Sequence, residues 1–325
     1  MDNHYGGHPA LDVCFVNQLL STFGNDRILL AVHKTQDTVT CMALVEPCGV
    51  GRWRVFSPAN APLVLMVVGE NASANTDCYA DLLRILPGFS WLLGSEHQDA
   101  RFPVLPTDAV DRRSESLPHK PSIRIDIQGS FSDYWRSRSQ RFRQNVERRR
   151  RGIAAAMTGL SFCWVREPHR ICAAVDSHAF LESSSWKGQT GTAISEQNGQ
   201  LSFYKAVLSE FALTGGALVG QLHGNDGVIA SQLAIKRRGI VVLLKTAYDP
   251  NLAQYGPGRL LQFHVLQHLF EEQNVKSIEF CTQASREDLK WVDECVEVHA
   301  VNFYRGIWLR NIFRALRRSA SHGIE

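Results

Sequence analysis

The chain has 325 residues, which is long for one hydrophobic core, so we expect two domains. Hydrophobic residues at 44% and charged residues at 21% are ordinary for a folded globular protein, and a formal net charge of +3 is too small to indicate a partner by itself. No stretch approaches the roughly 18 uninterrupted apolar residues of a membrane-spanning helix, the nearest being residues 62–69, which excludes such a helix.

Two further features indicate the compartment. The eight cysteines contain no CxxC pair and fall within predicted strands and helices, which favours reduced thiols over a disulfide framework. Residues 1–12 carry no basic start followed by an apolar run, so we expect no secretory signal. The sequence therefore predicts a cytoplasmic protein, and it leaves peripheral contact at the inner membrane open.

The N-terminal part predicts an antiparallel meander. Its β-rich runs are separated by polar turns and lie at residues 27–32, 38–45, 53–56 and 63–68. A helix is predicted at residues 73–86 and a further strand at 90–93. Residues 103–121 mix Pro, Ser, Asp and Arg with few apolar side chains, which suits an exposed connection. We therefore place a first domain at residues 1–118 and a second at 119–325.

The second part mixes helices and strands. The predicted strands lie at residues 122–127, 159–166, 217–223, 228–236, 240–248 and 277–281. The predicted helices lie at residues 130–157, 171–182, 201–214 and 258–273, and terminal segments at 296–304 and 308–318. Turns at Asn225-Asp226-Gly227 and Arg237-Arg238-Gly239 separate the three strands from 217 to 248, so these strands predict a second antiparallel meander. The order of elements makes an α+β fold with mixed, mostly antiparallel sheets.

Arginines cluster in two places, eight between Arg136 and Arg151 and five between Arg305 and Arg318. Along the first cluster, basic and apolar residues occupy opposite helix faces: Arg141, Arg148 and Arg151 on one, and Phe142, Val146 and Ile153 on the other. This pattern is typical of a solvated helix that covers a sheet, although an anionic acceptor, an acidic membrane surface and nucleic acid also fit it. The second cluster interleaves its arginines with Ile307, Trp308, Ile312, Phe313 and Leu316. That segment fits an interfacial helix or a last helix packed on the domain.

A strand that ends at Tyr248 is followed closely by a glycine-rich helix start, Gln254-Tyr255-Gly256-Pro257-Gly258-Arg259. Such a start gathers backbone N–H groups without intrahelical partners and the positive end of the helix dipole. Its glycines let a ligand come close to the main chain. The sequence therefore indicates a ligand that carries phosphate.

Residues 130–310 resemble the acetyltransferase domain of the GNAT superfamily, in the branch described as CelD- or BcsL-like and associated with cellulose and exopolysaccharide biosynthesis. The resemblance is carried by Phe131-Ser132-Asp133-Tyr134-Trp135 with the arginine-rich helix, Trp186-Lys187, Phe203-Tyr204, residues 245–250 and 256–261, and Lys290-Trp291. It implies a GNAT fold with two GNAT-like halves, of which residues 11–118 form a degenerate first half. It also implies transfer of an acyl group other than an aminoacyl group, from acetyl-CoA or another acyl-CoA, to an amine such as an amino-sugar precursor of surface polysaccharide.

The resemblance also implies roles for individual residues. The acyl-CoA would bind along the central strand and the helix start, through Leu244, Lys245, Thr246, Ala247, Gln254, Gly256, Gly258, Arg259 and Leu260. The proton transfers would fall to Tyr248, Asp249, Glu279 and Lys290. The acceptor side would include Trp186, Lys187 and Trp291. The chain departs from the family's pattern in two places, because Gln254 precedes Gly256 by two positions rather than three and residues 282–288 contain no glycine.

Two other functions fit the same sequence. A GNAT-like scaffold without catalysis at the inner membrane face would use the arginines and need no acyl-CoA. A Fem-like transferase would take aminoacyl-tRNA, and its binding would fall steeply with salt. With acyl-CoA as co-substrate, we expect an amine acceptor, a sugar nucleotide or lipid-linked sugar among the candidates, and no nucleic acid; the oligomeric state stays open. His264 and His268 stand four apart on one predicted helix, but no third ligand suggests itself, so we expect no metal site.

Overall fold

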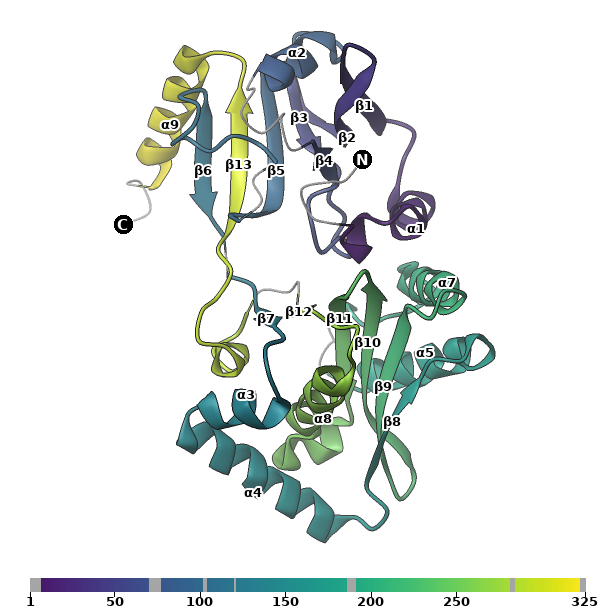
Figure 1. The fold of residues 1–325 in the computed structure, drawn as a ribbon. Helices are drawn as coiled ribbons and strands as arrows, with labels where there is room; N and C mark the ends of the chain where they lie inside the picture. The colour runs from purple at the N-terminus through teal and green to yellow at the C-terminus, as the bar shows by residue number, and fades with distance from the viewer. Residues whose placement is uncertain are drawn as a thin grey trace. The chain divides into compact units, whose positions relative to one another are not determined.

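The computed structural model describes residues 7–69, 77–101, 104–119, 121–185, 191–280 and 284–321. The chain forms two compact units (Figure 1). Unit 1 consists of Met1–Gly7, Gly24–Pro121 and Val296–Glu325, and unit 2 of His8–Phe23 and Ser122–Cys295. One crossing, between Pro121 and Ser122, lies close to the boundary that the sequence predicts after residue 118. The predicted division differs from the units at both ends of the chain, because residues 8–23 belong to unit 2 and the last thirty residues to unit 1.

Unit 1 is a seven-stranded sheet in the order β1-β2-β3-β5-β13-β6, with β4 also paired to β2. Its strands are β1 (Leu29–Thr35), β2 (Thr38–Gly49), β3 (Arg52–Val55), β4 (Met66–Val68), β5 (Leu92–Asp99), β6 (Ser114–Pro118) and β13 (Val298–Tyr304). Its helices are α2 (Asp77–Ile85) and α9 (Ile307–Ser321). The predicted meander is present, but β6 lies in the segment expected to be only a connection. β13 pairs between β5 and β6, so the end of the chain completes a sheet that its beginning starts.

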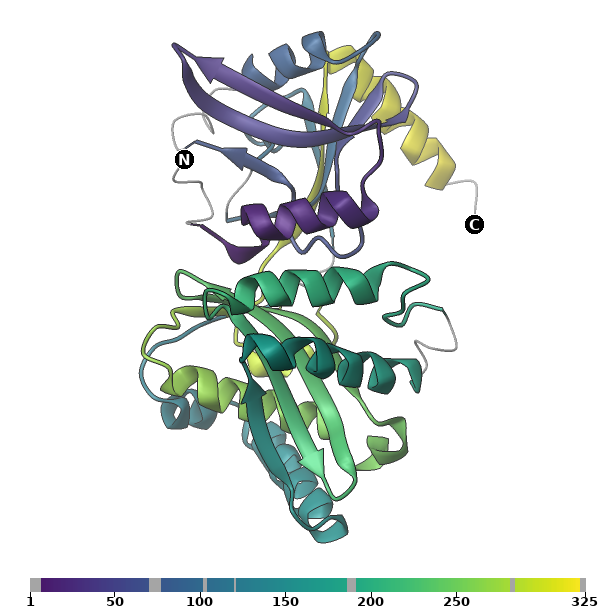
Figure 2. The ribbon, with the colours of Figure 1, turned by 90° about the vertical axis from the view of Figure 1, so that its right-hand side faces the viewer.

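Unit 2 is a six-stranded sheet in the order β7-β12-β11-β10-β9-β8. Its strands are β7 (Arg124–Asp126), β8 (Ser161–Val165), β9 (Ala217–Gly224), β10 (Gly227–Arg237), β11 (Ile240–Tyr248) and β12 (Ser277–Glu279). Its helices are α1 (Val13–Phe23), α3 (Phe131–Ser137), α4 (Gln140–Ala156), α5 (Pro168–Ser183), α7 (Gln200–Ala212) and α8 (Pro257–Glu271), with short 3₁₀ turns η1 (Pro9–Leu11), η2 (Pro250–Tyr255) and η3 (Asp288–Trp291). Helices α3, α4 and α8 cover one face of the sheet, and α5 and α7 cover the other (Figures 1 and 2).

Two local features of unit 2 differ from the sequence prediction. The single helix predicted at residues 130–157 is two helices, because Arg138 is extended and Ser139 caps a new start by accepting a hydrogen bond from the Phe142 N–H at 3.4 Å. The segment before residue 24, in which no helix or strand was predicted, contains α1. Its Phe15 ring lies buried against Phe203 of α7, with ring centroids 5.6 Å apart, so α1 gains its stability from a distant helix.

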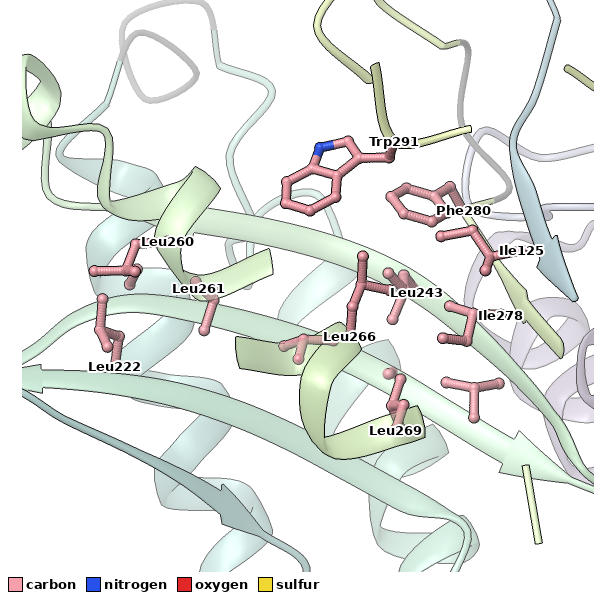
Figure 3. Close-up of a cluster of buried hydrophobic side chains, with 14 of the residues drawn as sticks. Ile125, Leu222, Leu243, Leu260, Leu261, Leu266, Leu269, Ile278, Phe280 and Trp291 are labelled. Atoms are coloured by element: carbon pink, nitrogen blue, oxygen red, sulfur yellow. The ribbon is translucent and has the colours of Figure 1, made fainter. Parts of the chain in front are cut away.

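The core of unit 2 lies between the sheet and the layer of α4 and α8 (Figure 3). Helix α8 contributes a buried face at helical spacing, formed by Leu260, Leu261, Val265, Leu266 and Leu269. Helix α4 contributes Phe142, Val146 and Ile153, which are the three apolar residues predicted to share its inner face. This core fixes the N-terminal end of α8 over β11, where the glycine-rich turn lies.

The same supersecondary pattern occurs in both units. In each, three strands form an antiparallel meander, a helix follows, and the next strand pairs in parallel with the last strand of the meander. In unit 1 these are β1, β2 and β3, then α2 and β5; in unit 2 they are β9, β10 and β11, then α8 and β12. The predicted α+β fold with mixed, mostly antiparallel sheets is therefore confirmed, and the repetition is consistent with two GNAT-like halves.

Candidate functional site

Strand β11 parts from β12 after a short parallel pairing. The two strands pair only at residues 240–242 and 277–279. Among the described residues, no strand pairs with this side of β11 from residue 243 to 248. On the opposite side, Leu244 is the extra residue of a bulge against β10, and bulges locally bend and twist a strand. The open edge of β11 therefore presents backbone N–H and C=O groups to an extended ligand.

Two adjoining cavities lie along this part of β11. The first, of about 340 Å³, lies between the glycine-rich turn, α4 and η3. The second, of about 300 Å³, lies beside residues 243–246 and Phe280. Three residues line both cavities: Thr246, Gln262 and Asp288. These cavities bring together most of the residues predicted to bind the acyl-CoA, namely Leu244, Lys245, Thr246, Gly256, Gly258 and Arg259.

The glycine-rich turn offers fewer backbone donors than the sequence suggests. Gly256, at a φ of 63°, donates its N–H to the carbonyl of Ala253. The N–H groups of Arg259 and Leu260 both donate to the carbonyl of Gly256, at 3.1 and 3.2 Å. Among the backbone N–H groups of Gly256, Gly258, Arg259 and Leu260, only that of Gly258 has no acceptor in the stretches that the structure describes.

Side chains cover both glycines of the turn. A Cβ added to Gly256 would collide with the guanidinium of Arg149, and one added to Gly258 would lie 3.1 Å from the Tyr248 ring. Since neither glycine could be replaced without moving these groups, the turn is shaped to hold Arg149 and Tyr248 at the cavity wall. The positive charge of the turn thus comes largely from side chains.

Two arginines, one from α4 and one from α8, share a partner beside this turn. Asn145 Oδ1 accepts from Arg149 Nε at 3.0 Å and from Arg259 Nη1 at 2.9 Å. Burial, and then the neighbouring Arg259 and Arg148, lower the pKa of Arg149 from its ordinary value. Glu287 pairs with Arg259 and with Lys290, and these contacts, the hydrogen bond from Lys290 first, lower the pKa of Glu287. The first cavity is therefore lined by two arginines, Arg149 and Arg259, and by two carboxylates, Glu287 and Asp288, with the arginines beside the turn.

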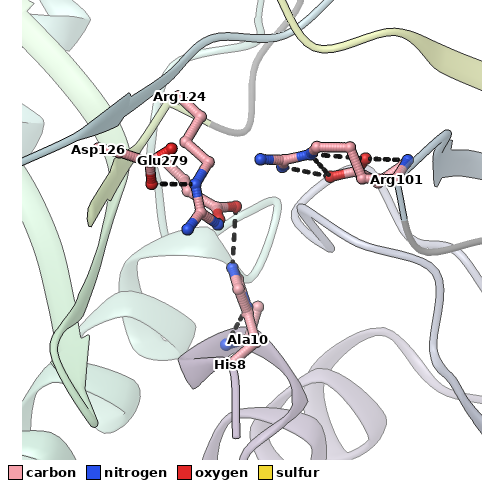
Figure 4. Close-up of polar contacts among 7 residues, drawn as sticks. His8, Ala10, Arg101, Arg124, Asp126 and Glu279 are labelled. Carbon is pink, nitrogen blue, oxygen red and sulfur yellow. Dashed lines mark hydrogen bonds and ion pairs between the residues drawn. The ribbon is translucent and has the colours of Figure 1, made fainter. Parts of the chain in front are cut away.

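Three of the four residues predicted to act in proton transfer lie away from both cavities. Asp249 caps η2, its Oδ1 accepting from the Asn251 N–H at 2.9 Å. Glu279 is buried in β12, where its carboxylate accepts from Arg124 Nη1 at 2.6 Å and lies 3.1 Å from His8 Nε2 (Figure 4). Lys290 points to Glu287 in η3. Tyr248 alone of the four lines a cavity. Asp249 and Glu279 thus have hydrogen-bond partners that give them structural roles.

The remaining predicted residues divide between the core and the site. Ala247 and Leu260 are buried, and Gln254 lies in η2 without lining either cavity. Trp291 is buried in the core and also lines the first cavity. Trp186 and Lys187 lie outside the described residues.

Lys245 connects the second cavity to the opposite face of the sheet. Its Nζ donates to Gln200 Oε1 at 2.9 Å and lies 3.6 Å from Glu182 Oε1. Glu182 is almost fully buried and also accepts from the Ile194 N–H at 2.8 Å. A buried carboxylate needs such partners, so this group holds α5 and α7 against β11.

Several residues that were not selected from the sequence line the cavities, among them Arg149, Gln262 and Asp288. Arg149 reaches the turn from α4, and its place among eight arginines gave no means of separating it from the others. Gln262 follows the turn by one helical step, and its buried Nε2 has no hydrogen-bond acceptor in the described part of the chain. Asp288 lines both cavities, and its Oδ2 accepts from the N–H and the hydroxyl of Ser285. The sequence could have indicated Gln262, because it stands four residues after Gly258 and therefore lies on the same face of the helix.

The described residues contain no group of three side chains able to hold a metal ion. His264 and His268 both pack on the Phe162 ring instead, with centroids 5.7 and 4.8 Å away. Burial, and then His268, lower the pKa of His264 to about 4.

The parted strands β11 and β12 and the start of α8 lie within a region of the chain that matches a known domain family. Residues 140–290 match the model of the acetyltransferase (GNAT) domain. These residues are a GNAT domain. The predicted GNAT domain is thereby confirmed. No curated protein sequence matches the chain.

Solved structures share the fold across both units. The C-terminal domain of a protein assigned as a lysylphosphatidylglycerol synthetase from Agrobacterium fabrum matches with a TM-score of 0.57 and 10% identity, covering 91% of this chain and 88% of that one. L-PGS from Bacillus licheniformis matches with a TM-score of 0.54 and 11% identity, covering 90% and 91%. FemX matches with a TM-score of 0.54 and 9% identity, covering 92% and 94%. At these identities the similarity shows the fold alone.

The kind of transferred group needs a correction. The sequence analysis predicted an acyl group other than an aminoacyl group. This prediction is wrong, because the solved structures that share the fold over nine-tenths of the chain include aminoacyl transferases, a lysylphosphatidylglycerol synthetase and FemX.

Proposed function

We propose that the protein is a Fem-like transferase whose GNAT domain moves an aminoacyl group from an aminoacyl-tRNA to an acceptor amine. One observation carries the proposal: beside the first cavity, the groups able to bind phosphate are mainly the side chains of Arg149 and Arg259, because only one of the four backbone N–H groups of the turn lacks an acceptor in the described residues. The aminoacyl transferases that share the fold support the same choice of acyl donor.

The arginines extend beyond the cavity along one face of α4. Arg141 and Arg148 stand seven residues apart and are exposed, and neither has an ion-pair partner in the described residues. At 1.5 Å per residue they span about 10 Å of the helix. Asn145 and Arg149 follow on the same side toward the turn, as their hydrogen bond and the contact of Arg149 with Gly256 show. A row of cations leading into a cavity suits the several phosphates of a tRNA acceptor end better than one pyrophosphate.

The open edge of β11 and the two cavities would then hold the end of the nucleic acid and its aminoacyl ester. Gln262 faces both cavities with a buried donor that lacks an acceptor, so it can donate to a ligand oxygen. The acceptor nitrogen attacks the ester carbon and loses a proton, and the ribose oxygen leaves and gains one. Outside the arginine–glutamate cluster, the titratable groups that line the cavities are Asp288, Tyr248 and Lys245. Lys245 is held by Gln200 and Glu182, so the proposal gives the first transfer to Asp288 and the second to Tyr248.

Acyl-CoA as the donor, the CelD- or BcsL-like branch, and an amino-sugar acceptor in surface-polysaccharide assembly stay predictions from sequence resemblance. The parted β11 and β12 would accommodate pantetheine as readily as a tRNA end. The experiment therefore compares the two donors directly.

The test is binding of aminoacyl-tRNA to the full chain, measured by fluorescence anisotropy from low to physiological salt, beside calorimetric titration with acetyl-CoA. Binding should weaken linearly in log K against log salt, and Arg141→Gln with Arg148→Gln should reduce the slope by about 1.4, or about 0.7 for each phosphate contact. Arg150→Gln is the matched control, since Arg150 pairs with Glu147. Absence of tRNA binding at low salt would overturn the proposal, and micromolar binding of acetyl-CoA in that case would restore the acyl-CoA prediction.

Transfer itself is measured as enzyme-dependent loss of labelled amino acid from tRNA in the presence of a panel of amines. Asp288→Asn and Tyr248→Phe should each slow this loss while leaving tRNA affinity within about twofold. Asp249→Asn, which alters only a turn cap, is the control for a nearby carboxylate. Equal rates in all three variants would contradict the roles given to Asp288 and Tyr248.

A further inference from the structure

Helix α9 is fixed to unit 1 by one edge of its surface. Leu309 is buried, and the ring of Phe313 stacks on Trp91 with centroids 4.6 Å apart. Arg317 pairs with Glu115 of β6 and donates to the Tyr304 hydroxyl at 2.8 Å. These contacts hold the helix on the sheet and fix which side faces outward.

The outward side carries a row of large apolar residues. Trp308, Ile312 and Leu316 are 62%, 48% and 58% exposed. They stand four residues apart, so they form one stripe along the helix. Single exposed apolar residues are common on protein surfaces, but a continuous stripe that includes a tryptophan marks a contact surface.

The helix itself carries charges of one sign only. Residues 307–321 contain four arginines and no aspartate or glutamate. With 100° between successive residues, Arg310 and Arg314 lie on the flank of the helix away from the apolar stripe. Arg314 is exposed. An apolar stripe on one side of a helix with arginines on the opposite side is the arrangement of helices that lie in the plane of a membrane interface.

Two loops of unit 1 near α9 also carry exposed apolar side chains. Phe89 is 65% exposed, and the guanidinium of Arg305 lies 5.0 Å from the centre of its ring. Val50 is 96% exposed, and its carbonyl accepts from Trp91 Nε1 at 3.0 Å. Because Trp91 also stacks on Phe313, Val50 lies close to α9. Two loops thus present apolar side chains, with an arginine, next to the helix.

We propose that this face, defined by Trp308, Ile312 and Leu316, docks on an anionic lipid surface. Apolar side chains would enter the boundary between headgroups and acyl chains, while the arginines contact negatively charged headgroups, each contributing about 1 kcal/mol. No helix in the described parts of the chain is long and apolar enough to cross a bilayer, so the contact is peripheral. The proposal concerns unit 1 and does not depend on the reaction proposed for the GNAT domain.

The experiment is co-sedimentation of the full chain with vesicles of phosphatidylcholine alone and of phosphatidylcholine with phosphatidylglycerol. The chain should bind the anionic vesicles at least about tenfold more strongly, and added salt should weaken the binding. The triple variant Trp308→Ser, Ile312→Ser, Leu316→Ser should lose about tenfold or more of this affinity. Because the three residues are exposed, its thermal unfolding should match that of the unaltered protein.

Two control variants separate the contributions. Ile85→Ser changes a residue of α2 that is equally exposed, and it should leave binding unchanged. Arg310→Gln with Arg314→Gln should remove the preference for anionic vesicles while leaving the apolar contact. Equal binding to both kinds of vesicle, or full binding by the triple variant, would overturn the proposal. A dimer in sedimentation velocity that the triple variant converts to monomer, without vesicle binding, would assign the stripe to a second copy of the chain.

Discussion

Substitution of Glu279 tests whether this buried carboxylate has a structural or a catalytic role. Its side chain is 9% exposed, and it accepts a hydrogen bond from Arg124 while lying beside His8. Removing one partner of a buried ion pair costs about 3–5 kcal/mol. Arg124 keeps a second partner, Asp126, at 2.7 Å, so we expect the lower end of that range for Glu279→Ala, about 3 kcal/mol. Glu279→Gln keeps one acceptor oxygen and should cost about 1.5–3 kcal/mol, the contribution of one hydrogen bond to a charged group.

The assay is urea unfolding of the full chain followed by circular dichroism, with transfer activity measured on the same samples below the transition. Glu147→Ala is the matched control, because its pair with Arg150 is exposed and should contribute less than about 1 kcal/mol. Glu279→Gln should lower stability while retaining activity at temperatures where it is folded. If Glu279→Gln instead left the free energy of unfolding unchanged and abolished transfer, the structural role would be refuted and the carboxylate would belong to the chemistry.

Three further predictions concern unit 2. Trp291→Ala should cost about 3–5 kcal/mol in urea unfolding, because a buried ring is lost, and a cost below 1 kcal/mol would show that its surroundings collapse freely. Lowering the pH from 7 to 5 should lower the melting temperature. Burial, and then His268, hold the pKa of His264 near 4 in the folded protein. The unfolded chain therefore binds a proton below about pH 6.5 that the folded chain does not bind. The His264→Phe variant should flatten this dependence, and an unchanged slope would contradict it. Gly256→Ala should lower the free energy of unfolding by about 1–2 kcal/mol, because Gly256 has a left-handed backbone conformation. The added Cβ should also displace Arg149, so tRNA affinity should fall together with stability. Unchanged tRNA affinity would mean that Arg149 does not bind the ligand.

The elements that repeat a local pattern were predicted well. The meander of β9, β10 and β11 and the start of α8 follow from alternation, turn residues and glycines, all of which act within a few residues. Helix α1 was missed because its amphipathic face packs on α7, nearly two hundred residues away in the sequence. The break between α3 and α4 was missed because the arginine-rich pattern continues through it, and only the cap at Ser139 shows it.

The sequence alone determined the α+β fold, the GNAT domain and the glycine-rich start of a helix at residues 256–259. Tertiary structure decided which charged groups belong to that site. It placed Arg149 on the glycine turn and joined Glu279 to His8 across 271 residues of sequence, leaving Asp288 at the cavities. A side chain's role depends on its burial and on the partner it meets, and these are set by contacts between elements that no local pattern encodes.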